Sequence, residues 1–455
     1  MKLKNRMIAL ILSLVMTLLM SSCTMVGKSP DQLIRPPRPT GEYAGIQRAL
    51  EEVAEDFTLK YPETGDYRSA FIERDLDGDG KKEFIAFYVS DTTNEYHINM
   101  IKKEEDNWKS VGDLIVGADE DIAISRIERV DFCDLDRDGV DEIITGWSSV
   151  SRSGKQMYIY KFEDARFVLK RPETYTEYAV VSISPDGGED LLLLHLNEAA
   201  KSSSASIIRL DGDKTVSIGN AVLDGNVTEY VKITAGNVAP GLRGVFIDSM
   251  KGSSVMITEL LYFGSEGGLT NPFYDMSNSE TWLTMREAAY ACRDINGDGI
   301  IEIPTLEPLR GYADLPPGER QYYTHWNQFG AQAYDGKDIL TVKLDVVLST
   351  YMNYTDGYYF VIPEQWLHNN ITVEADVANR MRVFYEWRDG KFADELVSIQ
   401  AVVKSAAQEQ SNALNIKLGE QLSNGQIYYA ALGNPSNREL QITSAQLLES
   451  FHMLL

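Results

Sequence analysis

Residues 75–83 read DLDGDGKKE, residues 134–142 read DLDRDGVDE and residues 294–302 read DINGDGIIE. Each loop has oxygen-bearing side chains at its positions 1, 3 and 5, glycine at position 6 and glutamate at position 9. Short acidic side chains at alternate positions of a tight turn can converge on one point, and glycine permits the sharp bend. Because a hard cation such as Ca²⁺ takes roughly six to eight oxygen ligands, the pattern predicts a calcium site in each loop.

The expected ligands are the side chains at positions 1, 3, 5 and 9, together with the backbone carbonyl of position 7. In chain order they are Asp75, Asp77, Asp79, Lys81 and Glu83; Asp134, Asp136, Asp138, Val140 and Glu142; and Asp294, Asn296, Asp298, Ile300 and Glu302. The loops resemble the first half of an EF-hand loop, but an EF-hand needs a glutamate at position 12 and then a helix. Alanine or threonine stands at position 12 here and strand-like residues follow, so position 9 is the expected closing ligand.

One loop of this kind could be an ordinary hairpin turn, but three loops with the same ligand positions favour metal binding. They are also spaced like repeats. The first two begin 59 residues apart, and the 160 residues from the second to the third leave room for two more units. Residues 182–190 keep positions 5, 6 and 9, and residues 236–244 keep only the glycine. About four strand-like stretches per 50–60 residues are typical of a β-propeller blade.

The Asp-x-Asp-Gly-Asp-Gly-x-x-Glu pattern resembles the loops of the FG-GAP/VCBS repeat family, which includes integrin α-chain propellers and bacterial surface proteins. The resemblance covers residues 65–340 and is specific in the three intact loops. It implies a mainly β fold in the form of a propeller, here of about five four-stranded repeats. In such a propeller, calcium binds between the first two strands of a blade. Carried onto this sequence, it implies up to three structural Ca²⁺ ions.

The N-terminus predicts export. A basic segment over residues 1–6 precedes an uncharged run over residues 7–20, which suits a signal peptide and is short for a membrane span. Residues 20–23 read MSSC, and small residues before a lone cysteine resemble the lipobox of bacterial lipoproteins. The resemblance implies a signal peptide over residues 1–22 and a lipid on Cys23 that anchors the chain to the outer face of a bacterial membrane. The alternative is an ordinary secretory signal that is cleaved nearby.

Composition divides the rest of the chain. Residues 23–42 contain four prolines and few apolar side chains, which predicts an extended Pro-rich tether. Residues 43–64 begin with apolar side chains at helical spacing, which predicts a helix leading into the propeller of residues 65–340. Residues 341–455 contain strand-like stretches and a terminal helical pattern, which predicts a small C-terminal α+β domain of unknown role.

Charge and motifs restrict the function. The net charge of -25, from 68 acidic against 43 basic residues, argues against nucleic-acid binding. Cys133 and Cys292 are expected to be buried free thiols, because an exported chain with so few cysteines is not a disulfide scaffold. The five histidines have no zinc-site spacing, and the sequence contains no nucleophile elbow or phosphate loop.

No catalytic residue is therefore predicted, and the chain is not expected to be an enzyme. The sequence favours a cell-surface, calcium-binding module that binds or scaffolds a protein or glycan partner without catalysis. The alternative is an extracellular polysaccharide hydrolase or lyase on a propeller scaffold, which rests on analogy between folds alone.

Overall fold

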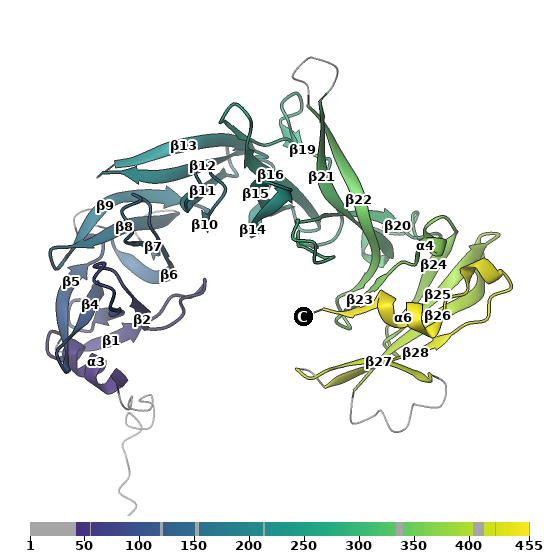
Figure 1. Cartoon of the computed structure of the whole chain (residues 1–455), viewed down its shortest axis with the longest axis horizontal. Coiled ribbons are helices and arrows are strands. Elements are labelled where there is room, and N and C mark those ends of the chain that lie inside the picture. Colours follow the sequence, from purple (N-terminus) through teal and green to yellow (C-terminus); the bar gives the residue numbers. More distant parts are fainter. Residues whose placement is uncertain are drawn as a thin grey trace, which may run out of the picture.

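The computed structural model describes residues 42–54, 56–118, 122–150, 154–212, 214–333, 340–403, 414–423 and 425–454. The expected signal peptide, the lipidation site Cys23 and the tether up to residue 41 lie outside the described residues. The described chain is mainly β, as the sequence predicts, and its strands form six main antiparallel sheets in succession. Figure 1 shows these sheets placed one after another along an arc.

The first sheet contains β1 (Phe57–Lys60), β2 (Phe71–Arg74), β3 (Glu83–Ser90), β4 (Tyr96–Glu104) and β5 (Asn107–Ile115). The second contains β6 (Ile124–Cys133), β7 (Glu142–Ser149), β8 (Lys155–Glu163) and β9 (Arg166–Tyr175). The third contains β10 (Glu177–Val181), β11 (Asp190–Asn197), β12 (Ser202–Asp211) and β13 (Lys214–Leu223). The fourth contains β14 (Glu229–Ala239), β15 (Leu242–Lys251), β16 (Val255–Phe263) and β17 (Leu269–Thr270).

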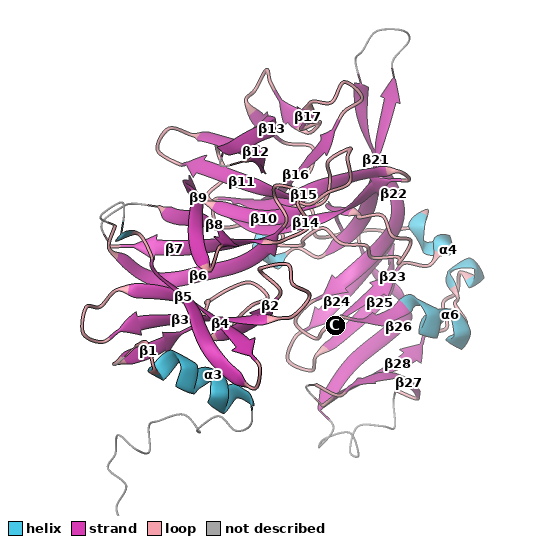
Figure 2. Cartoon of the chain, turned by 60° about the vertical axis from the view of Figure 1, so that its left-hand side comes forward, coloured by secondary structure: helices cyan, strands magenta, loops and turns pink. Residues whose placement is uncertain are grey.

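The fifth sheet contains β20 (Ile303–Pro308), β21 (Tyr322–Ala333), β22 (Leu340–Asn353), β23 (Tyr358–Val361) and β29 (Phe451–Met453). The sixth contains β24 (Ile371–Asp376), β25 (Met381–Arg388), β26 (Lys391–Val403), β27 (Ile416–Gln421) and β28 (Gln426–Leu432). A separate pair is formed by β18 (Tyr274–Asp275) and β19 (Glu280–Thr281). The helices are α3 (Glu42–Glu51), α4 (Glu364–Leu367), α6 (Ser444–Ser450), η2 (Pro317–Glu319) and η4 (Arg438–Leu440). Figure 2 shows the few helices at the edges of the sheets.

The second, third and fourth sheets are meanders, because their strands pair in chain order. In the first sheet β1 and β2 both pair with β3, along different parts of that strand. The fifth sheet takes its last strand, β29, from the C-terminal end of the described chain. Repeated four-stranded units are therefore present, as the spacing of the loops predicts.

Buried apolar clusters join each sheet to the next one along the arc. Strand β11 shows how this works, because alternate side chains of a strand point to opposite faces. Leu191 and Leu193 pack in the cluster shared with the second sheet, whereas Leu192 and Leu194 pack in the cluster shared with the fourth. A sheet between two others must be apolar on both faces, which explains the unbroken run of leucines.

The arc is open at the first sheet. Helix α3 covers the face of β3 that points away from the second sheet, with Ile46 and Leu50 against Phe84 and Tyr88. Among the described residues, no strand of the first sheet pairs with a strand of the fifth or sixth. A closed ring of blades is thus not seen here, because α3 takes the surface on which the last sheet would have to pack.

Two boundaries and one loop differ from expectation. The helix expected over residues 43–64 ends at Glu51, and Phe57–Lys60 form β1 instead, where the Phe57 ring packs 5.5 Å from that of Tyr88. The expected division at residue 340 falls within the fifth sheet, because β21 pairs with β22 across it. Residues 236–244 are not a ligand loop: most of them lie in the β14–β15 hairpin.

Candidate metal centres

The three acidic loops lie at equivalent places in the sheets. The first joins β2 to β3 and the second joins β6 to β7. The third precedes β20, and it is entered by an isolated bridge between Arg293 and Glu302 rather than by the expected strand. In each loop three carboxylates offer oxygens within 4.8 Å of one another: Asp75, Asp77 and Glu83; Asp134, Asp136 and Glu142; and Asp294, Asp298 and Glu302.

The glycine at position 6 bends each loop around the first aspartate. Its backbone has φ of +81° at Gly80, +93° at Gly139 and +85° at Gly299, a region that glycine enters without strain. From there its N–H donates to Oδ2 of the first aspartate, at 3.0, 2.9 and 2.9 Å respectively. This geometry agrees with the role that the sequence pattern gives to glycine.

The closing glutamates Glu83, Glu142 and Glu302 are fully buried. In each, Oε2 accepts the N–H of position 2, from Leu76, Leu135 and Ile295 respectively. Oε1 of Glu83 accepts no hydrogen bond, and Oε1 of Glu142 has a lysine nitrogen at 3.2 Å. Burial raises the pKa of all three glutamates, that of Glu142 to about 7. A buried acceptor without a donor, such as Oε1 of Glu83, is costly, and a cation where the loop carboxylates converge would satisfy it, so the residues present fit Ca²⁺.

The expected ligands at position 5 differ in their contacts from one loop to another. Asp79 and Asp138, at position 5, lie beside a lysine, while Asp298 accepts a hydrogen bond from Asn296 at 3.0 Å. For the carbonyl oxygens of position 7, at Lys81, Val140 and Ile300, the role of ligand remains a prediction.

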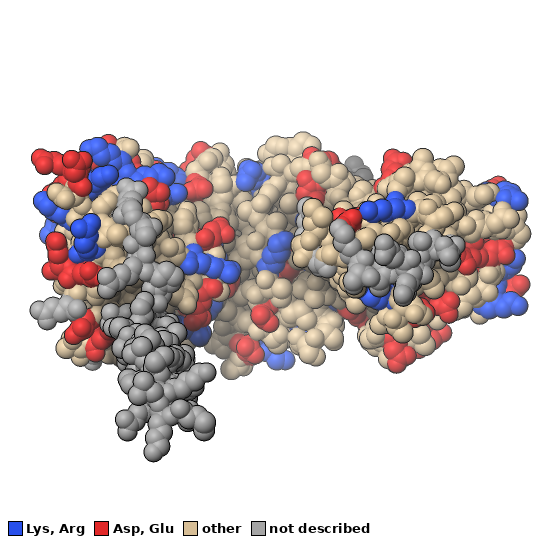
Figure 3. Space-filling view, turned by 90° about the horizontal axis from the view of Figure 1, so that it is seen from below, with Lys and Arg blue, Asp and Glu red and all other residues tan. Residues whose placement is uncertain are grey.

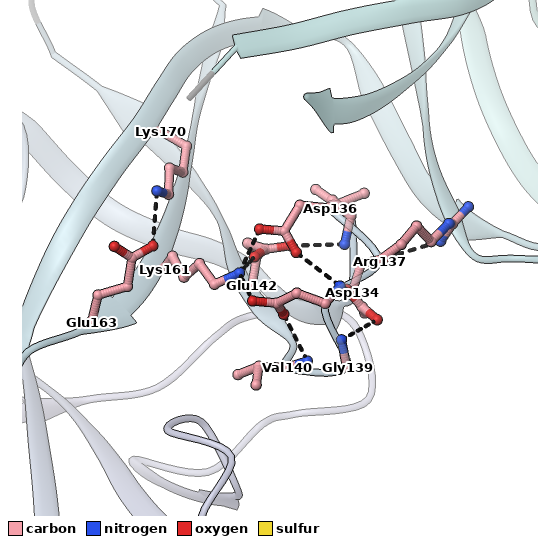
Figure 4. Close-up of polar contacts among 11 residues, drawn as sticks. Asp134, Asp136, Arg137, Gly139, Val140, Glu142, Lys161, Glu163 and Lys170 are labelled. Atoms are coloured by element: carbon pink, nitrogen blue, oxygen red, sulfur yellow. Dashed lines mark hydrogen bonds and ion pairs between the residues drawn. The ribbon is translucent and has the colours of Figure 1, made fainter. Parts of the chain in front are cut away.

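Two lysines that the sequence patterns did not single out reach into the first two loops. Lys161 of β8 contacts Asp136, and its Nζ lies 2.6 Å from Asp138 and 3.2 Å from Oε1 of Glu142. Figure 4 shows this ammonium group among the loop carboxylates. Burial works against the charge of Lys161, but its hydrogen bonds to the two aspartates outweigh burial and raise its pKa.

Lys102 of β4 repeats the arrangement in the first loop. It contacts Asp77, and its Nζ lies 2.8 Å from Asp79 and 3.7 Å from Oε1 of Glu83. In the third loop a neutral residue takes this place: Nε2 of Gln328 donates to Asp298 at 2.7 Å and to Glu302 at 2.9 Å. The common spacing of 19 residues from the closing glutamate could have identified both lysines, whereas Gln328, 26 residues after Glu302, is found only from the strand register.

In the turn of the third unit, where no metal site is predicted, arginines face the acidic side chains. Asp190, fully buried at position 9, lies 2.9 Å from Nη2 of Arg209 and 2.8 Å from Nη2 of Arg137. Arg209 also pairs with Asp186 at 2.7 Å. Positions 1 and 3 are serines here, so the turn has two ligand-position carboxylates, and they face two arginines, Arg209 of β12 and Arg137 of the second loop.

Other surfaces offer less chemistry. A hollow of about 890 Å³ lies on the sixth sheet, lined by residues that include Glu374, Tyr385 and Glu395. On the face shown in Figure 3, acidic and basic side chains are interspersed. Cys133 and Cys292 are buried free thiols, which confirms the prediction. No helix within the described ranges has the length and apolar character needed to span a membrane.

Comparison with known proteins finds distant likenesses among solved structures. No family model and no curated protein matches this chain. Among solved structures, it is similar to the exotype rhamnogalacturonan lyase YesX at 10% identity and a TM-score of 0.28, over 85% of this chain and 66% of that one. For the Dos1 propeller the values are 10%, 0.25, 66% and 65%, and for Bacillus licheniformis rhamnogalacturonan lyase PL11 they are 10%, 0.29, 86% and 74%.

The chain thus spans just under two thirds of the length of the first two of these structures. Likenesses at this level of identity and TM-score assign neither a family nor an activity. The resemblance to FG-GAP/VCBS repeats therefore stays a prediction that rests on the loops.

Proposed function

We propose that this chain is a cell-surface, calcium-binding lipoprotein that acts as a non-catalytic binding or scaffold module. The observation that carries the proposal is the set of closing glutamates. Each is fully buried and lies within a group of convergent carboxylates, and Oε1 of Glu83 accepts no hydrogen bond. Proteins rarely bury such groups without a partner, and a divalent cation is the partner that this oxygen-rich environment suits.

Calcium would be held by the aspartates at positions 1, 3 and 5 and the glutamate at position 9, with Asn296 at position 3 of the third loop. When bound, the ion would supply a fixed positive charge that ties the loop to the start of the following strand. The residues themselves fix the geometry, because Gly80, Gly139 and Gly299 hold the first aspartate in place through their N–H groups. The role proposed for the ion is structural.

The anchor and the partner complete the proposal. A lipid on Cys23 would hold the protein on the outer face of a bacterial membrane, and the tether would separate the sheets from the lipid. The helix α3 begins at Glu42, where the Pro-rich sequence ends. A protein or glycan partner would bind the sheets. Membrane fractionation of cells producing the wild type or Cys23→Ser tests the anchor: the variant should leave the membrane fraction.

Thermal unfolding of the mature chain during a calcium titration tests the metal part. The melting temperature should rise with calcium, and Asp77→Ala should reduce the rise because it removes one ligand of the first loop. Asp211→Ala is the matched control, since Asp211 is the last residue of β12, where a plain Asp-Gly turn leads to β13. A wild-type melting temperature that does not respond to calcium would contradict calcium binding.

Screens of protein and glycan libraries test the functional part. The module should bind a partner without converting it. Cleavage of a polysaccharide would instead establish the alternative, an extracellular hydrolase or lyase. Both readouts should come from the same glycan panel, so that binding and turnover are measured on identical material.

A further inference from the structure

The register of the sheets places one residue opposite the closing position of every loop. Extending each ladder by one pair beyond its last hydrogen-bonded partners aligns position 9 with a residue of the following strand. The resulting pairs are Glu83 with Lys102, Glu142 with Lys161, Asp190 with Arg209, Gly244 with Tyr262 and Glu302 with Gln328. A basic residue therefore faces three of the four acidic closing residues, and the unit that has lost the acid has lost the base as well.

The lysine nitrogen lies at the point where the ligands converge. Nζ of Lys161 is in contact with the position 3 and position 5 carboxylates and is 3.2 Å from Oε1 of Glu142. Those are the oxygens that would face a metal ion. Only 7% of the lysine side chain is exposed, so it does not merely pass over the surface of the loop. Its ammonium group and a calcium ion could not both occupy this space.

The third loop differs by a matched pair of changes. It has Asn296 where the other loops have aspartate, and Gln328 where they have lysine. One negative and one positive charge are lost together, so the excess of carboxylates over cations is the same as in the first two loops. What differs is the centre of the loop, where the third has an amide instead of an ammonium group. Calcium therefore meets no fixed positive charge in the third loop.

We propose that Lys102 and Lys161 are tethered counter-ions that compete with calcium for the first two loops, so that the third loop fills with calcium first. This inference rests on the proposed calcium binding and adds an order to it. Without calcium, the first two loops remain closed by their lysines. With rising calcium, the ion displaces each ammonium group into solvent. The turn at residues 182–190 is the limiting case, in which two arginines have replaced the metal altogether.

Calorimetric calcium titration and thermal unfolding of the mature chain test the proposal. Wild type should show one tight site and two weaker ones, and Asp298→Ala should remove the tight one. Lys161→Gln, which copies Gln328, should strengthen calcium binding at the second loop by about tenfold or more, because it removes a positive charge from the site. The same variant should melt at a lower temperature in EDTA and recover in saturating calcium.

The reciprocal variant, Asn296→Asp with Gln328→Lys, should weaken the tight site by about tenfold or more while keeping the melting temperature in EDTA. This reciprocal variant still tests the proposal if Lys161→Gln does not fold. Lys170→Gln is the matched control: it lies on the neighbouring strand β9 and pairs with Glu163 at 2.9 Å, away from the loop (Figure 4). It should leave the calcium affinities unchanged.

Unchanged calcium affinities in Lys161→Gln, or a tight site that survives in the reciprocal variant, would overturn the proposal. Three wild-type sites of equal affinity that no lysine substitution shifts would overturn it too, while leaving the proposed function intact. A wild type that binds no calcium would contradict the proposed function. In that case a calcium site gained by Lys161→Gln would still support the role of the lysine.

Discussion

The second acidic loop and the turn of the third unit occupy the same place in neighbouring sheets, yet they handle charge differently. Both lie between the first two strands of a sheet, and both end on a fully buried carboxylate, Glu142 or Asp190. In the second loop four ligand-position carboxylates face one lysine, whereas in the third unit two carboxylates face two arginines. An unbalanced excess of carboxylates, rather than the shape of the turn, therefore distinguishes a candidate metal site.

The largest loss of stability should come from removing Asp190, the buried acid in the turn of the third unit. Asp190→Ala leaves Arg137 without its anion and Arg209 with Asp186 alone, which should cost about 3 kcal/mol of unfolding free energy. Because this turn uses no metal, the loss should be equal in calcium and in EDTA, as measured by urea unfolding. Asp186→Ala is the control and should cost less, since about half of the Asp186 side chain, 52%, is exposed. A loss of unfolding free energy in Asp190→Ala that depends on calcium would contradict the difference drawn between this turn and the second loop.

The corresponding change in the second loop should depend on calcium. Glu142→Gln removes a ligand, so the variant should lose up to about 2.7 kcal/mol at calcium a hundredfold above its dissociation constant. In EDTA the change should be close to neutral, because burial already disfavours the ionised form of this glutamate and raises its pKa to about 7. Urea unfolding in both conditions gives the two values. Equal losses in the two conditions would show that Glu142 acts through the lysine alone.

A pH titration separates loop glutamates from a glutamate elsewhere. Burial raises the pKa of Glu259 from 4.5 to about 7, and its Oε2 accepts no hydrogen bond. The folded state therefore keeps a proton that the unfolded state has released, and the stability this contributes is lost as pH rises through about 7. Glu259→Gln should be more stable than wild type by about 2 kcal/mol at about pH 8, and the gain should vanish by about pH 5.

Calcium should not alter this profile, because Glu259 pairs with Asn271, Thr281 and the Asp224 N–H rather than with an acidic loop. The measurement is thermal or urea unfolding across the pH range, with and without calcium. A stability difference between Glu259→Gln and wild type that is constant with pH would rule out the buried proton.

The smallest effect concerns the backbone of the second loop. Arg137 has φ of +64° at position 4, where the other two loops have Gly78 and Gly297 with φ of +72° and +78°. Arg137→Ala removes the contacts with Asp190 and keeps the strained backbone, whereas Arg137→Gly removes both. The glycine variant should therefore be the more stable of the two by about 1 kcal/mol. Equal unfolding free energies would mean that the loop relaxes around alanine without strain.

Local patterns in the sequence were enough to identify the acidic loops, the strand periodicity and the buried thiols, because each depends on neighbouring residues. The residues that contact the closing acids from the following strand are placed there by the register of the paired strands. Lys102, Lys161 and Arg209 each follow the closing acid of their loop by 19 residues, a spacing that the sequence analysis did not use, whereas Gln328 follows Glu302 by 26. The open arc could not be foreseen either, since it depends on how α3 packs against β3.

Each buried cluster of the arc joins only two consecutive sheets, and this has a consequence for how the molecule opens. Stability in such an array is close to a sum of units and nearest-neighbour interfaces, as in solenoid proteins. Sheets in the middle are held from both sides by other sheets, whereas the sixth is held by the fifth and by the short helices α4, η4 and α6, and the first by the second and α3. Amide hydrogens should therefore exchange most slowly in the third and fourth sheets and faster toward both ends, so that the molecule frays from its ends inward.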